Sequence, residues 1–144
     1  MGLVRFQVSG IMGQPRPRFS TINGRVRAYD SASATEYKEQ IATACMIACR
    51  KKNIKMPIEA DGKGFGIKIL AAYKCPKSFS KIKERQALAD EIKPTKKPDA
   101  DNIAKIVLDG LNQVMWHDDN QVTRLEIEKT YSDKEYIDIE IKWD

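Results

Sequence analysis

Acidic side chains that could bind a metal ion are concentrated in one stretch of this sequence. In order along the chain, the stretch holds Asp99, Asp101, Lys105, Asp118 and Asp119. Carboxylates that lie close together repel one another, and a cation between them keeps them ionised. A hard divalent ion such as Mg²⁺ suits these oxygen ligands, because it takes one or two carboxylates together with waters and substrate phosphates. The stretch therefore predicts a metal site that acts on a phosphate-containing substrate.

The chain that carries this acidic stretch is basic. Its 144 residues include 25 Lys and Arg against 20 Asp and Glu, which gives a formal net charge of +5 at pH 7. A positive excess of this size is compatible with nucleic-acid binding, but many basic proteins only carry solvated surfaces. The combination of a basic protein with one acidic stretch indicates an enzyme that cleaves a polyanion with the help of a metal ion.

A helix expected from about Asp101 to Val114 would position the first of these groups. Asp101, Lys105 and Asp109 are spaced four residues apart, so they lie on one face of that helix. Asp99 stands just before the helix and can lean over its N-terminus, where free N–H groups and the helix dipole favour anions. Lys105 would then face the scissile phosphate and neutralise the charge that builds up in the transition state.

Asp118 and Asp119 lie in the turn after this helix, which can fold back toward the same edge. Carboxylates from the helix start and from the turn would then bracket a metal ion that generates a hydroxide nucleophile, with one or two ions dividing the work. Each group also has an ordinary structural explanation when taken alone: a helix cap, a surface ion-pair ladder or a hydrophilic turn. Their coincidence on one side of one helix favours the metal site.

Metal chemistry based on other ligands is not supported. His117 is the only histidine, and an exposed loop position is expected for it rather than a zinc site. Cys45, Cys49 and Cys75 form no Cys-x-x-Cys pair, and the first two are expected to pack side by side in the core. Free thiols indicate a reducing compartment, hence a cytoplasmic protein. No long apolar run is present, so no membrane-spanning helix is expected.

Basic side chains in the N-terminal region are candidates for DNA contacts. Residues 10–27 are expected to form a loop rich in Gly and Pro. Arg16 and Arg18 should project from the same side of this loop, because the backbone is extended before each proline. A solvated basic loop and a phosphate-binding loop are both compatible with this composition.

Hydrophobic periodicity predicts an α+β fold. Strands are expected at residues 3–9, 64–74, 123–128 and 137–143, and helices at residues 33–52, 78–90 and 101–114. The last two strands are expected to form a hairpin across Ser132–Lys134. A capping box at Ser33–Glu36 is expected to open the first helix. Residues 1–144 are thus expected to form a single domain, a mixed β-sheet of about four strands with three helices packed on it.

Three motifs in the chain resemble the RusA family of Holliday junction resolvases, which is common in bacteria and their prophages. They are Lys97–Lys105 with the sequence KPDADNIAK, Leu108–Asn112 with the sequence LDGLN, and Asp118–Val122 with the sequence DDNQV. Further similar features are the Gly13–Arg18 loop, Tyr29, Tyr37 and the Ser- and Lys-containing segment Pro76–Lys83. The resemblance therefore spans nearly the whole chain.

The resemblance implies a Mg²⁺-dependent endonuclease that cleaves four-way DNA junctions as a homodimer, with Mn²⁺ as an alternative ion. It implies that Asp99, Asp101 and Asp119 are catalytic metal ligands and that Lys105 is the catalytic lysine. The implied supporting residues are Asn102, Asp109 and Asp118. Two equivalent active sites on a two-fold dimer would match the near two-fold symmetry of a junction.

The chain departs from the family pattern at two positions near these residues. Pro98 stands where some members have a basic residue, so the DNA contacts beside Asp99 are assigned to Lys96 and Lys97. Gly110 occupies a position where alanine is frequent, and is expected to loosen the helix slightly. A further supporting role is expected for Asp109, whose i,i+4 spacing would let it hold Lys105 in place.

Two other functions remain compatible with the sequence. A non-catalytic DNA-binding protein would use Arg16, Arg18, Lys96 and Lys97, and its binding would depend strongly on salt but not on Mg²⁺. A metal-dependent nuclease with another substrate would cleave flaps, replication forks or single strands. Activity on four-way, three-way and linear DNA, measured with and without Mg²⁺, distinguishes all three.

Overall fold

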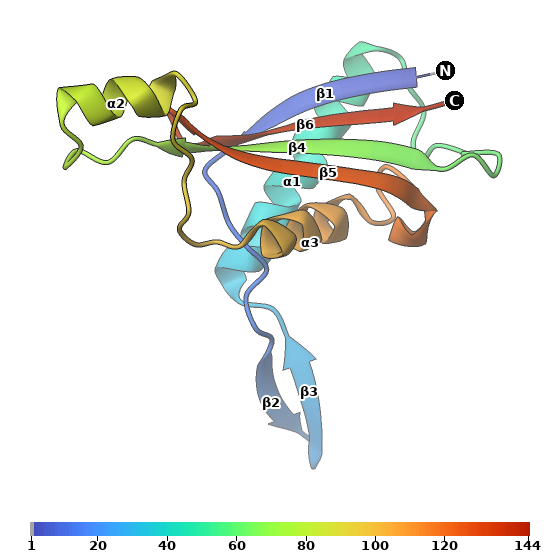
Figure 1. Cartoon of the computed structure of the whole chain (residues 1–144). Coiled ribbons are helices and arrows are strands. Elements are labelled where there is room, and N and C mark those ends of the chain that lie inside the picture. Colours follow the sequence, from blue (N-terminus) through green and yellow to red (C-terminus); the bar gives the residue numbers. More distant parts are fainter. Residues whose placement is uncertain (1) are drawn as a thin grey trace.

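The structure is a computed structural model that describes residues 2–144. Along the chain it contains β1 (Gly2–Ser9), β2 (Arg18–Ile22), β3 (Arg25–Tyr29), α1 (Ala32–Lys51), β4 (Phe65–Lys74), α2 (Lys81–Leu88), α3 (Ala100–Leu111), the 3₁₀ turn η1 (Asp119–Gln121), β5 (Val122–Ser132) and β6 (Tyr136–Trp143). Figure 1 shows a sheet with helices beside it and a separate hairpin that projects from the body. The expected α+β class with a four-stranded mixed sheet and three helices is confirmed.

The main sheet has the strand order β1-β6-β4-β5. β4 pairs with β6 in antiparallel and with β5 in parallel orientation. The expected hairpin between β5 and β6 is therefore wrong, because β4 lies between these two strands. The burial of the strands explains the order. β4 is largely apolar and mostly buried, as a central strand must be, whereas β5 is rich in charged residues and has no buried residue, which suits a sheet edge.

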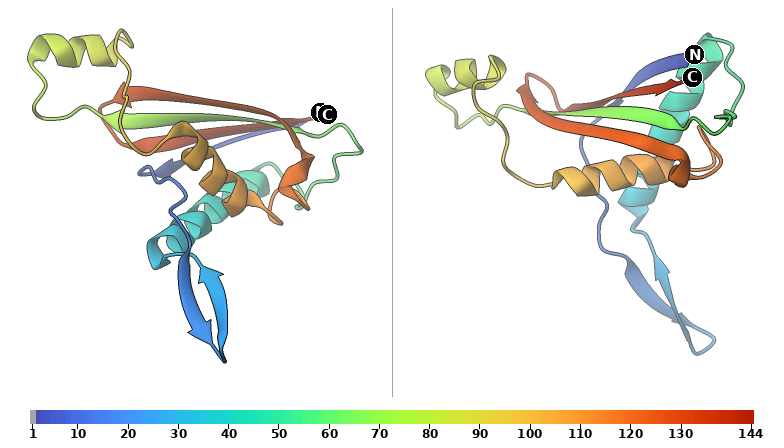
Figure 2. Two further views of the ribbon diagram at one scale, coloured as in Figure 1. Left: turned by 60° about the horizontal axis from the view of Figure 1, so that its bottom comes forward. Right: turned by 45° about the vertical axis from the view of Figure 1, so that its right-hand side comes forward.

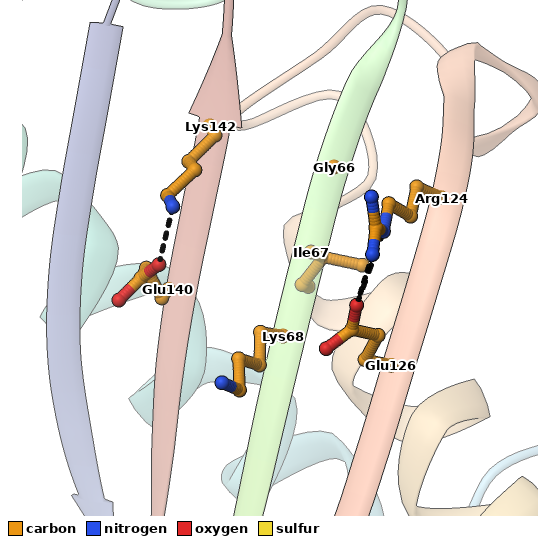
Figure 3. Close-up of a pocket in the computed structure, with 7 residues that line it drawn as sticks. All are labelled: Gly66, Ile67, Lys68, Arg124, Glu126, Glu140 and Lys142. Atoms are coloured by element: carbon orange, nitrogen blue, oxygen red, sulfur yellow. Dashed lines mark hydrogen bonds and ion pairs between the residues drawn. The ribbon is translucent and has the colours of Figure 1, made fainter.

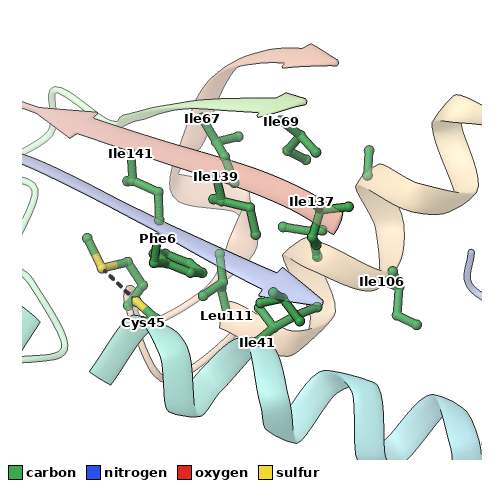
Figure 4. Packing of buried hydrophobic residues seen from close by; sticks show 14 of the residues in the cluster. Phe6, Ile41, Cys45, Ile67, Ile69, Ile106, Leu111, Ile137, Ile139 and Ile141 are labelled. Carbon is green, nitrogen blue, oxygen red and sulfur yellow. Dashed lines mark hydrogen bonds between the residues drawn. The ribbon is translucent and has the colours of Figure 1, made fainter. Parts of the chain in front are cut away.

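Helices α1 and α3 cover one face of the main sheet, and the core lies between them and the strands (Figures 1 and 2). Figure 4 shows how the isoleucines of β4 and β6 meet side chains from α1 and α3. Ile41 of α1, Ile106 and Leu111 of α3, and Ile139 of β6 are fully buried. This packing fixes α3 against the body along its whole length.

The basic segment between β1 and α1 is a β-hairpin, so the loop expected there is wrong in part. β2 and β3 pair in antiparallel register from Arg18↔Tyr29 to Ile22↔Arg25. The turn between them is Asn23-Gly24, where φ is 53° at Asn23 and 74° at Gly24. Asn-Gly with positive φ at both residues is the preferred two-residue hairpin turn. The sequence thus contained a clear hairpin signal.

Helix α1 begins earlier than expected and helix α2 begins later. α1 is capped by Ser31 rather than Ser33, because the Ser31 hydroxyl accepts a hydrogen bond from the Ala34 N–H at 3.2 Å. α2 begins after Ser80, and it stands beyond one end of the sheet (Figure 1). Ile82 and Leu88 of α2 are exposed, so this helix contributes little to the core.

The buried thiols agree with the sequence. Cys45 and Cys49 are fully buried, and Cys45 lies 3.7 Å from the Met115 sulfur, which confirms the expected core packing. In the part of the chain that the structure describes, every helix is too short or too polar to cross a bilayer.

Candidate functional site

Helix α3 carries four of the seven catalytic and supporting candidates, and its inner face is packed against the body. Ile103, Ile106 and Val107 are fully buried on its inner face. Near its C-terminal end, a Cβ at Gly110 would lie 3.2 Å from the Lys38 carbonyl oxygen and 3.3 Å from the Ile41 Cβ. Gly110 therefore has a packing role, because the missing side chain lets α3 lie close to α1. Burial of this face leaves the opposite face of the helix for polar groups.

The outer face of α3 presents Asp101 and Lys105 to solvent, one turn apart. Within residues 2–144, Lys105 takes part in no ion pair, so its ammonium group is available to an incoming anion. Asn102 is half-buried, and its carbonyl oxygen accepts a hydrogen bond from the Gln14 N–H at 2.9 Å. Asn102 thus ties the N-terminal loop to the start of α3.

Asp99 is the N-cap residue of α3, but its side chain accepts no hydrogen bond from the helix N–H groups. A simple capping role therefore does not account for this carboxylate. Its neighbour Pro98 is fixed by two donors, because the Pro98 carbonyl oxygen accepts hydrogen bonds from the Tyr73 hydroxyl and the Lys129 ammonium, both at 3.1 Å. Burial, together with the negative charges of Glu135 and Asp99, raises the pKa of Tyr73 to about 12. Tyr73 therefore stays protonated as a hydrogen-bond donor at neutral pH.

Lys129 and Tyr73 are positioning residues that sequence reasoning missed. Lys129 lies on β5 and donates at 2.5 Å to the Lys96 carbonyl oxygen as well as to Pro98. Its ammonium nitrogen is 5.1 Å from the centre of the Tyr73 ring. These contacts join strands β4 and β5 to a segment about thirty residues away in the chain, and no local motif signals such a contact.

Asp118 and Asp119 lie beyond the other end of α3. The Asp119 N–H donates to the Asn112 side-chain oxygen at 3.0 Å, which holds η1 beside the C-terminus of the helix. The Asp118 carboxylate accepts a hydrogen bond from the Asn120 N–H at 3.0 Å. This bond helps to lower the pKa of Asp118, while the adjacent Asp118 carboxyl group raises the pKa of Asp119. The pair therefore concentrates negative charge that a cation would relieve.

The aspartates form two separate pairs within one chain. Asp99 and Asp101 lie at the N-terminal end of α3, and Asp118 and Asp119 lie at its C-terminal end. A helix of 12 residues is about 18 Å long, so one chain alone keeps the two pairs apart. Accordingly, no group of three or more His, Cys, Asp or Glu side chains in residues 2–144 of a single chain is arranged to hold a metal ion.

The ligand chemistry of both pairs nevertheless fits a hard divalent cation. All four groups offer carboxylate oxygens, the donors that Mg²⁺ prefers. Asp99 is exposed and has no capping bond, and Asp119 lies against a second carboxyl group that disfavours its ionised form. Asp99, Asp101 and Asp119 are therefore suitable ligands if a second chain brings the two helix ends together.

Asp109 contacts Lys38 of α1. The Lys38 ammonium lies 3.6 Å from the Asp109 carboxylate and 2.6 Å from the Asp30 carboxylate. Asp30 also accepts a hydrogen bond from the Gln14 side chain at 3.0 Å. The ion-pair partner of Asp109 is thus Lys38 rather than the expected Lys105. Lys38 thus joins α3 to the segment after β3, and Asp30 in turn joins that segment to Gln14 before β2.

The four candidate DNA-binding residues lie in two places. Arg16 and Arg18 are exposed at the start of the hairpin. Lys96 and Lys97 are exposed in the segment that leads into Asp99, and the Lys96 ammonium nitrogen is 5.7 Å from the centre of the Tyr73 ring. His117 is exposed, as expected, and its Nε2 lies 2.8 Å from a Glu59 carboxylate oxygen.

The open face of the sheet holds a shallow depression of about 300 Å³ that is remote from α3. Figure 3 shows the charged side chains around it, which come from β4, β5 and β6. Glu126 pairs with Arg124 at 2.7 Å, and Glu140 pairs with Lys142 at 3.4 Å. Paired charges of both signs are typical of a solvated sheet face, so this depression offers no catalytic group.

Two comparisons with known proteins place the chain among its relatives. Residues 10–142 match the family described as Endodeoxyribonuclease RusA. The chain is also 32% identical over 145 residues to "Uncharacterized protein YqaN" of Bacillus subtilis (strain 168), an alignment that covers 99% of this chain and 97% of the relative. Both matches extend over the hairpin, α3 and the two aspartate pairs.

Proposed function

The chain belongs to the RusA endodeoxyribonuclease family, and from this premise we propose that it is a Mg²⁺-dependent endonuclease that resolves Holliday junctions by paired nicks during recombination and repair. The arrangement of α3 is the main structural support for this proposal. A buried inner face fixes the helix, while its two ends and its outer face offer carboxylates and a lysine, Lys105, that forms no ion pair in the described part of the chain. Such groups suit the hydrolysis of a phosphodiester bond.

The metal site of the proposed enzyme is shared between two subunits. Asp99 and Asp101 at the start of α3 would bind the ion together with Asp119 of the partner subunit, because the length of the helix separates these groups within one chain. A two-fold dimer forms two such sites, and each subunit contributes to both. When bound, Mg²⁺ or Mn²⁺ would lower the pKa of a coordinated water and neutralise phosphate charge.

The side chains of this protein have distinct roles around that ion. Lys105 lies one turn after Asp101 and would place its positive charge against the scissile phosphate, which it stabilises as negative charge builds up. Asp118 supports Asp119 by anchoring the η1 turn through its bond to Asn120. Lys96 and Lys97 would hold the DNA backbone beside Asp99 through their exposed charges.

Cleavage of labelled four-way, three-way and linear DNA, with and without Mg²⁺, tests the proposal. We expect Mg²⁺-dependent paired nicks in the four-way junction and little cleavage of linear duplex. Salt-sensitive binding that is indifferent to EDTA, without cleavage, would show a DNA-binding protein instead. Preferred cleavage of flaps, forks or single strands would show a nuclease with a different substrate.

An Asp101→Asn variant tests the assignment of the metal ligands. We expect cleavage to be abolished while junction binding is retained or strengthened, because a negative charge near phosphate is removed. Asp133→Asn is the matched control, since Asp133 lies in the turn between β5 and β6, away from α3. Cleavage by Asp101→Asn at the control rate would refute the assignment.

Mixing of inactive subunits tests whether the site is shared. A subunit with Asp99→Asn and Asp101→Asn is mixed with a subunit that carries Asp119→Asn. In a shared arrangement, the mixed dimer has one site with all its ligands intact, and we expect nicking on one strand to return. If each site uses one subunit only, every site in the mixture keeps a defect and no activity returns.

A further inference from the structure

The β2–β3 hairpin is the most exposed feature of the molecule. It extends away from the sheet and from α3 in every view (Figures 1 and 2). Nine of its ten strand residues are exposed, and the tenth, Ser20, is half-buried. A two-stranded hairpin of this length is marginally stable by itself in water. A binding partner that covers the hairpin would therefore stabilise it.

The hairpin has one basic face and one apolar face. Residues that pair directly across two antiparallel strands share a face, and successive residues alternate between faces. The pairs Arg18↔Tyr29, Ser20↔Arg27 and Ile22↔Arg25 place three arginines on one face. The pairs Phe19↔Ala28 and Thr21↔Val26 form the other face, on which Phe19 is 67% exposed and Val26 is 70% exposed.

The charge of the hairpin identifies the chemistry of its partner. Residues 15–29 contain four arginines and no acidic residue. In the described residues, none of these arginines forms an ion pair. Unpaired guanidinium groups suit phosphates, which they contact in bidentate geometry. Two copies of this hairpin, each with four arginines and no acidic residue, would repel each other at such a face, so the charge favours a polyanion over a second copy.

The apolar face indicates which part of a DNA molecule the hairpin contacts. Proteins that unstack DNA combine basic side chains with an inserted apolar wedge, often Phe. In an intact duplex, stacking covers the faces of the base pairs. At a branch point, the base pairs that flank the crossover can be unstacked, and their faces become available to an aromatic or branched side chain.

From these observations we propose that the β2–β3 hairpin is an arm that inserts at the branch point of the DNA junction. Arg18, Arg25 and Arg27 contact phosphates, and Phe19 with Val26 packs on the exposed base pairs. This inference rests on the proposed function and adds to it the element that distinguishes a branch from a duplex.

The base of the hairpin connects this arm to helix α3. The backbone N–H of Gln14, before β2, donates a hydrogen bond to the Asn102 carbonyl oxygen of α3. The Asp30 carboxylate, after β3, accepts hydrogen bonds from the Gln14 side chain and from the Lys38 ammonium. Lys38 in turn contacts Asp109 of α3. The arm therefore has a defined position relative to Asp99, Asp101 and Lys105.

Two double variants separate the faces. Phe19→Thr with Val26→Thr removes the apolar surface but keeps residues that favour strands. Arg25→Gln with Arg27→Gln removes two positive charges. The matched control, Arg50→Gln with Lys51→Gln, removes two exposed positive charges from the end of α1. Circular dichroism and thermal unfolding confirm that each full-length variant is folded.

Binding to a labelled four-way junction and to a linear duplex is measured without Mg²⁺, with 2-aminopurine at the branch point as a reporter of unstacking. We expect the apolar-face variant to lose about five- to one-hundred-fold in junction affinity, the range that aromatic stacking supports, with duplex affinity unchanged. Its 2-aminopurine signal should also fall. The Arg25 and Arg27 variant should weaken binding to both DNAs and reduce the slope of log K against log salt by about 1.8.

The outcomes separate this inference from the proposed function. If the unaltered protein cleaves junctions selectively but both hairpin variants bind like the control, the arm is refuted and the function stands. If the apolar-face variant instead converts a dimer into monomers during sedimentation, that face contacts a second copy and the arm is also refuted. Failure of the unaltered protein to distinguish junction from duplex would overturn the function and the arm together.

Discussion

Helix α3 and the β2–β3 hairpin use opposite physical strategies. The inner face of α3 is fully buried at Ile103, Ile106 and Val107, and α1 approaches it closely at Gly110. None of the strand residues of the hairpin is buried, and its base joins it to the body (Figure 2). Close packing leaves little free space around a buried helix and so holds it in place, which suits catalytic groups. An exposed ribbon can adjust to a substrate whose shape varies.

The two regions also differ in how charge is placed. Carboxylates lie at both ends of α3, and between them lies Lys105, which forms no ion pair within residues 2–144. On the hairpin, arginines occur without any acidic residue. We infer that α3 determines the chemistry and that the hairpin determines where on the DNA this chemistry takes place. Variants of each region test that division.

The largest effect is expected from Lys105→Ala on the chemical step. Loss of one group that stabilises transition-state charge costs about 10²- to 10³-fold in rate. We expect a decrease of this size in single-turnover junction cleavage, with junction affinity mostly retained. Lys134→Ala, in the turn between β5 and β6, is the matched control for loss of one exposed lysine. A loss of affinity equal to the loss of rate would make Lys105 a docking contact and weaken the contrast between α3 and the hairpin.

Paired truncations compare the packing of the two regions. Ile106→Ala removes a fully buried side chain and should lower the free energy of unfolding by about 2–5 kcal/mol. Val26→Ala removes a mostly exposed one and should change it by less than about 0.5 kcal/mol. Urea denaturation measures both. Similar values for the two variants would show that the hairpin is packed against something in solution.

The sequence predicted α3 and its surroundings better than it predicted the hairpin. The strong helical periodicity of Ile103, Ile106 and Val107 reports a buried face, so the outward position of Asp101 and Lys105 follows from local spacing. For the hairpin, the prolines and arginines before β2 dominated the interpretation as a loop. Asn23-Gly24, with its positive φ values, was the missed signal.

Long-range pairing could not be predicted from local patterns. β5 and β6 follow one another in the chain with a short connection, which favours a hairpin, yet β4 separates them because its apolar side chains need the central position. For the same reason, the spacing of Asp109 pointed to Lys105, whereas its contact is Lys38 from a distant helix. The two aspartate pairs are separated by the length of α3. This separation could not be predicted either, because it depends on the contact that holds η1 at the C-terminal end of the helix.

A smaller effect is expected from Lys38→Met, which disconnects the base of the hairpin from α3. Methionine keeps the apolar stem but leaves the Asp30 and Asp109 carboxylates without their shared cation. Because these carboxylates are about one-third exposed, the loss of stability should be modest, about 1 kcal/mol. We expect junction binding to change little and cleavage to slow, because the arm would bind without fixing α3. Equal effects on binding and cleavage would contradict that coupling.

The smallest effect is expected from acidification, through Asp30 at the base of the hairpin. Its hydrogen bond to the Lys38 ammonium lowers the pKa of Asp30, with smaller contributions from the charge of Lys38 and from Gln14. A carboxyl group with a lowered pKa in the folded state stabilises the protein above its unfolded pKa of about 3.9, and this stabilisation is lost as the pH falls through the folded value.

The unaltered protein should therefore have a higher free energy of unfolding than Asp30→Asn at pH 7, and this difference should shrink below about pH 4. Hydrogen exchange, corrected for its intrinsic pH dependence, locates the loss: protection should fall in β2 and β3 before it falls in α3. Uniform loss across both elements would mean that Asp30 supports the whole fold. A loss confined to the hairpin would show that its position depends on a few polar contacts, whereas apolar packing holds α3 in place independently of pH.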